Sequence, residues 1–164
     1  MSFGQSFQIT PMQMLRAAAA IVNGGNLVTP HFATRTCAAD KTTYSEFSYS
    51  TTQEAVSKET SDTMKDILRQ VVEEGGGKNA YIEGFSIGGK TATSQKLPRG
   101  SGKYIASFIG FSDVTDPSVI AMCLIDEPQG VYYGGTIAAP VIRELYDNIL
   151  PVSYTHLRAH ETRG

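Results

Sequence analysis

The chain has 164 residues, a length typical of one domain, and its 41% hydrophobic content predicts a packed core rather than a disordered chain. The formal net charge is −2 and no basic stripe is present, which argues against nucleic acid as a partner. No apolar run approaches the roughly 18 residues needed to span a bilayer, and no signal peptide precedes the first predicted helix. We therefore expect any membrane anchor to lie outside this chain.

A first helix is predicted near the start of the chain. Thr10 is placed to cap it, Pro11 suits the first helical position, and Gln13 can close a capping box. Gly24-Gly25 is expected to end this helix, because glycine tolerates the left-handed conformation that follows a helix. The largely polar stretch over residues 26–56 is expected to be irregular, with short extended segments.

A second helix is expected over about residues 58–74, where apolar side chains recur at the spacing of one helix face. These side chains are Met64, Ile67, Leu68, Val71 and Val72. Three strand candidates follow, over residues 88–94, 104–111 and 119–125, and a last helix is expected over about residues 136–150. We therefore expect an α+β fold in which a three-strand antiparallel meander is flanked by helices.

The end of the chain, residues 152–164 (VSYTHLRAHETRG), shares no pattern with the rest. The string resembles a translated sequencing adaptor, so we expect one domain over residues 1–151 and a non-native tail after it. The alternative is a native tail in which His156 and His160 bind a metal. Elsewhere the two cysteines show no metal-ligand spacing, and Cys123 is expected to be a core residue. We therefore expect no metal and no cofactor.

A phosphate-binding motif is present by sequence alone. Residues 84–91 (GFSIGGKT) match G-x-x-x-x-G-K-[ST], which binds phosphates when a strand precedes the loop and a helix follows it. Here the motif runs into ATSQKLPRGSG, which does not favour a helix, and no parallel βαβ unit surrounds it. We therefore reject nucleotide binding and interpret residues 88–94 as a strand.

As a strand, residues 88–94 place Thr91 and Thr93 on one face, with Lys90 beside them. Two hydroxyls, a lysine and the free amides of a sheet edge suit the carboxylate end of an extended peptide that binds by strand addition. The alternative is an ordinary exposed strand with a surface lysine. The residues alone leave both interpretations open.

The segment GGKTATS resembles the K-[ST]-G-T motif of the serine penicillin-recognising enzymes. Four segments resemble monofunctional (class B) penicillin-binding proteins in order and spacing, with most similarity to the division or sporulation-specific members of Gram-positive bacteria. They are residues 2–25, 73–91, 103–111 and 125–151. The resemblance implies an incomplete penicillin-binding protein/serine β-lactamase-like transpeptidase fold.

The resemblance also implies acyl transfer on peptidoglycan. In the family, a serine attacks the penultimate D-Ala carbonyl of a stem peptide, and an amine of a neighbouring stem then accepts the acyl group. β-Lactams mimic the D-Ala-D-Ala end and acylate the same serine. On the matching positions, Lys90 is implied to support proton transfer, the hydroxyls of Thr91 and Thr93 to bind the substrate carboxylate, and the Thr93 N–H to form half of the oxyanion hole. The loop at residues 132–135 is expected to be structural.

The sequence departs from the family in lacking the S-x-x-K segment, which holds the nucleophile and its base, and the S-x-N segment. Ser57-Lys58, Ser94-Gln95-Lys96 and Ser101-Gly102-Lys103 have the wrong spacing or position. Both missing motifs precede the K-T-G strand in the family. We therefore expect a fragment that alone neither cross-links peptidoglycan nor reacts with penicillin.

Two functions remain open. The first is a fragment of a cell-wall D,D-transpeptidase whose parent is anchored in the cytoplasmic membrane, with this domain on the outer side. The second is a non-catalytic scaffold that binds peptidoglycan or the membrane proteins of division or sporulation. Ala92 bears on this choice because the family has glycine there. Its methyl group is expected to point away from Thr91 and Thr93, and it can displace the Thr93 N–H.

Overall fold

A three-stranded antiparallel sheet forms the centre of the computed structural model, which describes the backbone of residues 8–161 and the side chains of residues 8–151. Its strands are β5 (Ile87–Gln95), β6 (Tyr104–Ser112) and β7 (Val119–Asp126), in that order. The expected meander is confirmed. Residues 2–7 of the first family-like segment lie outside the described residues.

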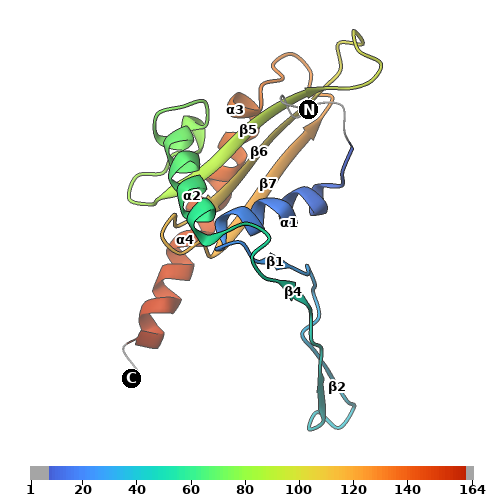
Figure 1. Cartoon of the computed structure of the whole chain (residues 1–164), viewed down its shortest axis with the longest axis vertical. Helices are drawn as coiled ribbons and strands as arrows, with labels where there is room; N and C mark the ends of the chain where they lie inside the picture. The colour runs from blue at the N-terminus through green and yellow to red at the C-terminus, as the bar shows by residue number, and fades with distance from the viewer. Residues whose placement is uncertain (1–7, 162–164) are drawn as a thin grey trace.

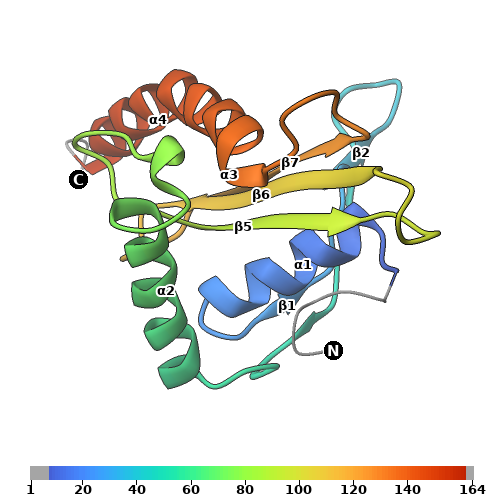
Figure 2. The ribbon, with the colours of Figure 1, turned by 90° about the horizontal axis from the view of Figure 1, so that it is seen from above.

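Helices cover both faces of this sheet (Figures 1 and 2). The short α3 and the long α4 lie on one face and α1 lies across the other, while α2 stands beside β5. Their bounds are α1 Pro11–Val22, α2 Lys58–Glu73, α3 Gly134–Ile137 and α4 Ala139–Glu161. The α+β class expected from the sequence is therefore confirmed. Among the described residues, no helix combines the length and apolar character needed to cross a bilayer.

The first helix begins as its sequence predicts. The Thr10 hydroxyl accepts a hydrogen bond from the N–H of Gln13, and the Gln13 side chain accepts one from the N–H of Thr10, which completes the capping box. Gly24 and Gly25 follow the helix with φ of 80° and 92°, so glycine is needed there. These signals are read correctly from sequence because they act within a few residues.

Only part of the apolar stripe of α2 is buried. Val72 is buried and Leu68 packs against a small cluster around Phe111, but Ile67 is 47% exposed. Ile67 is exposed because no described element covers that part of α2. Helical spacing therefore predicted the helix correctly and overestimated the buried part of its stripe.

The single helix expected over residues 136–150 is wrong in its bounds. The structure has two helices, with a break at Ala138 and a new start at Ala139. Pro140 explains the break, since proline has no N–H to continue the ladder and is tolerated only in a first turn. The helix α4 continues to Glu161, and the side chains of residues 152–164 lie outside the described residues. The non-native origin of that tail stays a prediction.

The region between the first two helices forms an arm that projects from the body (Figure 1). At its base, β1 (Leu27–Val28) pairs with β4 (Thr51–Thr52). Further out, β2 (Arg35–Cys37) pairs with β3 (Tyr44–Glu46), and every residue of both strands is exposed. The weak strand character expected here corresponds to these short pairs.

The main core lies between the sheet and α4. Phe108 from β6 and Ile142, Tyr146 and Leu150 from α4 are fully buried there. The Tyr146 hydroxyl donates to the carbonyl oxygen of Gly110 at 2.6 Å, and burial raises the pKa of this tyrosine. Cys123 is half-buried against the same core, as expected, and burial raises the pKa of its thiol.

The short α3 lies very close to the sheet because its first residue is glycine. A Cβ atom on Gly134 would lie 2.2 Å from the carbonyl oxygen of Ser107 and 2.4 Å from that of Ala92. Gly135 is equally constrained, since its Cβ would lie 2.4 Å from the carbonyl oxygen of Gly76. Gly134 therefore lets α3 pack directly on the backbone of β5 and β6, and Gly135 lets it pack on the loop after α2, which supports the structural role expected for residues 132–135.

Removal of the Tyr146 hydroxyl tests the link between α4 and the sheet. Tyr146→Phe is expected to lower the free energy of unfolding by about 1 kcal/mol, because a buried donor–acceptor pair is lost while the ring stays. Urea denaturation followed by circular dichroism measures the change. Tyr81→Phe removes a hydroxyl from a tyrosine that is 45% exposed and serves as the matched control. Equal effects of both variants would contradict the packing described.

A methyl group on Gly134 tests the close approach of α3. Gly134→Ala is expected to lower the free energy of unfolding by about 1–3 kcal/mol, because the helix must move away from the sheet. Gly76→Ala is the control, since its Cβ would meet only the Thr91 hydroxyl oxygen, at 4.0 Å. If the two variants unfold at the same urea concentration, the contact between α3 and the sheet is not as close as described.

Candidate functional site

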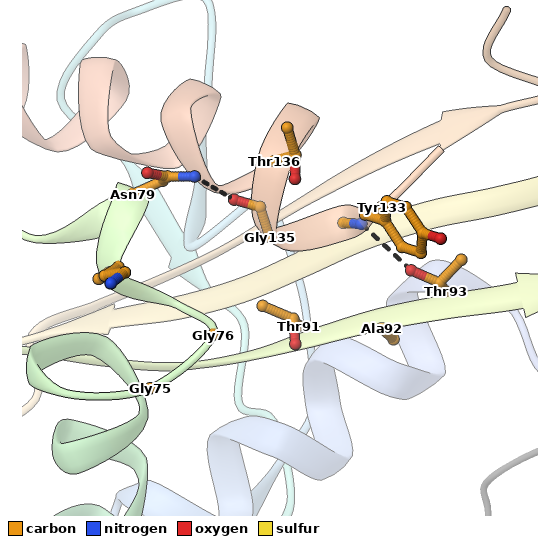
Figure 3. Close-up of a pocket in the computed structure, with 11 residues that line it drawn as sticks. Gly75, Gly76, Asn79, Thr91, Ala92, Thr93, Tyr133, Gly135 and Thr136 are labelled. Carbon is orange, nitrogen blue, oxygen red and sulfur yellow. Dashed lines mark hydrogen bonds between the residues drawn. The ribbon is translucent and has the colours of Figure 1, made fainter. Parts of the chain in front are cut away.

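The pairing of β5 with β6 divides the predicted site residues between the two faces of the sheet. Gly89 faces Phe108 and the α4 side, whereas Gly88 faces Phe111 and the α1 side. Because side chains alternate along a strand, Thr91 and Thr93 share the side of Gly89. Ala92 lies on the opposite side (Figure 3), as expected from the sequence, and it is exposed.

The same pairing directs backbone groups of β5 to its outer edge. The N–H of Lys96 donates to the carbonyl of Lys103, and β5 continues this register along β6. In an antiparallel pair, every second residue turns its N–H and C=O toward the partner strand. The N–H groups of Thr91 and Thr93 therefore point away from β6. Within the described chain β5 is an edge strand, so these N–H groups are available to an added peptide.

Lys90 lies at this outer edge, apart from the cleft that the threonines line. Its ammonium group donates to the carbonyl oxygen of Thr91 at 2.6 Å, and its side chain is exposed. The Thr91 carbonyl also points away from β6, because the N–H and C=O of one residue face the same side of an antiparallel strand. The structure thus places the lysine charge beside the free edge of β5 and both threonine hydroxyls on the side of α3.

A cleft of about 320 Å³ lies between β5, α3 and the loop that follows α2 (Figure 3). Thr91, Ala92 and Thr93 form one side of it. The remaining lining comes from the loop after α2 and from the start of α3: Gly75, Gly76, Lys78, Asn79, Tyr133, Gly134, Gly135 and Thr136. The cleft brings together three segments that are far apart in the sequence.

The hydroxyl groups in the cleft are able to donate to a ligand. Thr93 Oγ1 accepts a hydrogen bond from the N–H of Gly134 at 3.2 Å, which leaves the hydroxyl proton free to donate. Within the described residues, the Thr91 hydroxyl has no hydrogen-bond partner in the protein. Two hydroxyl protons and a row of outward N–H groups form a set of donors that suits a carboxylate.

The wall opposite the threonines was not predicted as part of the site. The sequence predicted only that the second helix ends at about residue 74, and α2 does end at Glu73, just before the glycine run at Gly75. A single 3₁₀ turn, Lys78–Ala80, follows, and the Asn79 amide donates to the carbonyl oxygen of Gly135 at 2.8 Å. This bond ties the loop to α3. No local pattern could have revealed it, because 56 residues separate its two partners.

Stacked aromatic rings lie next to the part of the cleft that Tyr133 lines. Tyr104 and Tyr132 are parallel with ring centroids 4.1 Å apart, and Tyr132 and Tyr133 are tilted at 4.7 Å. A hydrogen bond with Tyr132 raises the pKa of Tyr133, which is 56% exposed. The stack therefore links Tyr104, the first residue of β6, to Tyr133 in the lining of the cleft.

Ion pairs fix the far end of the β5–β6 hairpin next to this stack. The Lys96 ammonium lies 2.8 Å from Glu127 and 2.9 Å from Asp126, and Lys103 lies 3.0 Å from Glu127. Hydrogen bonds to Glu127 and Asp126 raise the pKa of Lys96, and the bond to Lys96 lowers the pKa of Glu127. The strand that carries the threonines is thus tied down beyond the cleft.

The phosphate-binding interpretation fails on geometry. Lys90 and Thr91 lie in the middle of a nine-residue strand, and the next element is another strand, β6, rather than a helix. Among the described side chains, no group of three His, Cys, Asp or Glu residues could hold a metal ion. The cleft offers hydroxyl, amide and ammonium donors instead.

Comparison with known proteins places these features in a family. Residues 1–147 match the family model described as the penicillin-binding protein transpeptidase domain. Stage V sporulation protein D of Bacillus subtilis is 39% identical over 155 residues, which cover 92% of this chain and 24% of that protein. The protein named "Probable peptidoglycan D,D-transpeptidase PenA" of Neisseria meningitidis is 34% identical over 163 residues, which cover 94% of this chain and 26% of that protein.

Solved structures agree with these relatives. Penicillin-binding protein 3 of Mycobacterium tuberculosis, crystallised with ampicillin, matches with a TM-score of 0.80 at 26% identity, over 92% of this chain and 36% of the other. The chain thus spans between 24% and 36% of the length of these three proteins. The resemblance to class B penicillin-binding proteins is confirmed. Because the family model covers most of its length, the chain belongs to the penicillin-binding protein transpeptidase domain family.

Proposed function

We propose that this chain is the carboxylate-binding part of a peptidoglycan D,D-transpeptidase domain, formed by residues 1–151, with residues 152–164 as a non-native tail. The observation that carries the proposal is the placement of the Thr91 and Thr93 hydroxyls in a cleft beside the free edge of β5. The peptide that suits this edge is a stem peptide with a D-Ala-D-Ala end. Peptidoglycan lies outside the cytoplasmic membrane, so the parent protein must present this domain there.

Each residue at the edge has a separate role in this proposal. The Thr91 and Thr93 hydroxyls bind the terminal carboxylate of the stem peptide. The outward N–H of Thr93 stabilises the negative charge that develops on the attacked carbonyl oxygen, a contribution of about 3–4 kcal/mol in serine hydrolases. Lys90 adds positive charge at the same edge and supports proton transfer. Strand addition along β5 holds the peptide backbone.

The described chain has these binding groups without a serine nucleophile. The sequence contains no S-x-x-K segment and no S-x-N segment, and the serine of β5 itself, Ser94, is followed by Gln95 and Lys96. A covalent mechanism requires a nucleophile next to its base. In this proposal the chain recognises peptide ends and β-lactams as ligands, and acyl transfer belongs to the complete parent protein.

Removal of one hydroxyl tests carboxylate binding. The chain is expected to bind a short peptide that ends in D-Ala-D-Ala, and Thr91→Val is expected to weaken binding by about tenfold or more, because a hydrogen bond to a charged group is lost. Chemical-shift titration of the labelled chain measures the affinity. Thr52→Val, an exposed strand threonine outside the cleft, is the control. The same peptide with a C-terminal amide should bind more weakly. Equal affinity for acid and amide would refute the proposed site.

Reaction with a fluorescent penicillin tests the missing nucleophile. The purified chain is expected to show no covalent label on a denaturing gel, since no serine in it has the required base at the required spacing. A complete class B penicillin-binding protein treated in parallel serves as the positive control. Labelling at one serine that excess unlabelled penicillin blocks would show that this chain has a nucleophile of its own.

A further inference from the structure

The arm between the first two helices carries aromatic rings that do not contribute to the core. Every residue from 31 to 55 is exposed, and the hairpin of β2 and β3 projects from the body (Figure 1). Phe32 is fully exposed, Tyr44 is 50% exposed and Phe47 is 47% exposed. A two-stranded hairpin is only marginally stable in water, and these rings bury little area to support it. A concentration of exposed rings on one segment marks a contact surface.

Strand pairing divides the arm into two faces of different chemistry. Arg35 lies opposite Glu46 in the hairpin. Cys37 lies opposite Tyr44 on the same face, because side chains alternate along each strand. The Arg35 guanidinium lies 4.7 Å from the centre of the Tyr44 ring, which agrees with this arrangement. Phe47 follows Glu46 and therefore lies on the other face, away from both charged residues of β2 and β3.

The face that carries Phe47, which we call the ring face, holds three rings and two hydroxyls. Its rings are those of His31, Phe47 and Tyr49. Its hydroxyls are those of Thr36 and Ser45, which lie opposite each other across the hairpin. His31 and Tyr49 are stacked with ring centroids 3.8 Å apart, and the Phe47 ring lies 6.3 Å from that of Tyr49. None of these five residues is a lysine, an arginine, an aspartate or a glutamate.

The stacked rings are held in position although they are exposed. The Tyr49 hydroxyl donates to the carbonyl oxygen of Ala33 at 2.7 Å. The Nδ1 atom of His31 lies 2.8 Å from the carbonyl oxygen of Thr29, whose hydroxyl donates to the carbonyl oxygen of Ser50 at 2.8 Å. Backbone carbonyls thus orient both members of the stacked pair. A ring that is ordered beforehand loses little conformational entropy when a ligand binds to it.

An uncharged, ordered surface of rings and hydroxyls suits a sugar. The face of an aromatic ring carries negative potential, and one face of a pyranose ring presents C–H groups that are weakly positive. The hydroxyls of Thr36 and Ser45 can both donate to and accept from the hydroxyl and N-acetyl groups of a sugar. An anionic partner such as a nucleic acid or an acidic lipid surface would instead require lysine or arginine, which the ring face lacks.

We propose that the ring face binds the glycan strand of peptidoglycan, a chain of N-acetylated pyranose sugars. The inference rests on the proposed function and deepens it, because the glycan is the polymer to which the stem peptides are attached. The arm and α3, which lines the cleft, lie toward opposite ends of the long axis of the molecule (Figure 1). The arm therefore holds the polymer at a second point, while one of its stem peptides occupies the cleft.

A sugar without a peptide tests the ring face on the whole chain. Tetra-N-acetylchitotetraose, a short chain of linked N-acetylglucosamine units, is titrated against the isotope-labelled chain. The amide signals of His31, Phe47 and Tyr49 are expected to shift more than those of the residues that line the cleft. The affinity should be the same in about 0.05 M and about 0.5 M salt, because no charged group of the protein takes part.

Matched variants assign the binding to the ring face. Phe47→Ala is expected to weaken sugar binding by about fivefold, because one aromatic contact is lost. Phe47→Leu keeps an apolar side chain without the ring and should weaken binding to a similar extent. Tyr44→Ala removes a ring of similar exposure from the charged face and should leave the affinity unchanged. The amide signals of β2 and β3 show that the hairpin remains formed in each variant.

The outcomes separate this inference from the proposed function. No shift on the arm, a loss of binding in high salt, or full binding by Phe47→Leu would overturn the glycan site. Shifts of the ring face when the chain is concentrated without sugar would assign that face to a second copy, which also overturns it. These results leave the threonine cleft intact, because the sugar has no D-Ala-D-Ala end. Arm shifts with the sugar and no binding of the D-Ala-D-Ala peptide would overturn the proposed function of the cleft alone.

Discussion

The antiparallel pairing of β5 with β6 determines what every residue of the site can do. A shift of one residue in this pairing would exchange the two faces and turn Thr91 and Thr93 toward α1. The observed register instead places both hydroxyls in the cleft and their N–H groups at the free edge. Glycine at position 88 helps to fix this register, since a Cβ on Gly88 would lie 2.2 Å from the Phe111 ring. Packing of the core and orientation of the donors are thus set by the same pairing.

Close approach of backbones builds the rest of the cleft. Gly134 and Gly135 allow α3 to lie against β5 and against Gly76, so the cleft walls are largely main chain. A main-chain wall has few rotatable side chains to order when a ligand binds, which lowers the entropic cost of association. The bond from the Gly134 N–H to Thr93 has the same effect, because it holds the threonine rotamer before a ligand arrives.

The sequence predicted the parts of the fold that depend on local signals. The capping box at Thr10, the glycine stop at Gly24-Gly25 and the meander follow from a few neighbouring residues, and the structure agrees. The break before Pro140 was missed because the apolar pattern continues across it. Lys78 and Asn79 could not be identified as cleft residues, since their position beside α3 results from tertiary packing alone. The threonines were found through a motif whose strand conformation the structure then supported.

In the proposed function, the strand also determines the direction from which the nucleophile of the parent protein approaches. A carbonyl oxygen bound to the outward N–H of Thr93 lies beyond the free edge of β5, and a nucleophile must reach within about 3–3.5 Å of the attached carbon. Next to Thr93, the α3 side is occupied by Gly134 and Tyr133, whereas Lys90 and Ala92 are exposed on the opposite side of the strand. In the proposed function, the attacking serine of the complete parent protein would therefore approach from outside β5, near the Lys90 ammonium. That direction of approach is consistent with the proposed role of Lys90, whose ammonium group lies at this edge and would stabilise the charge that moves during proton transfer.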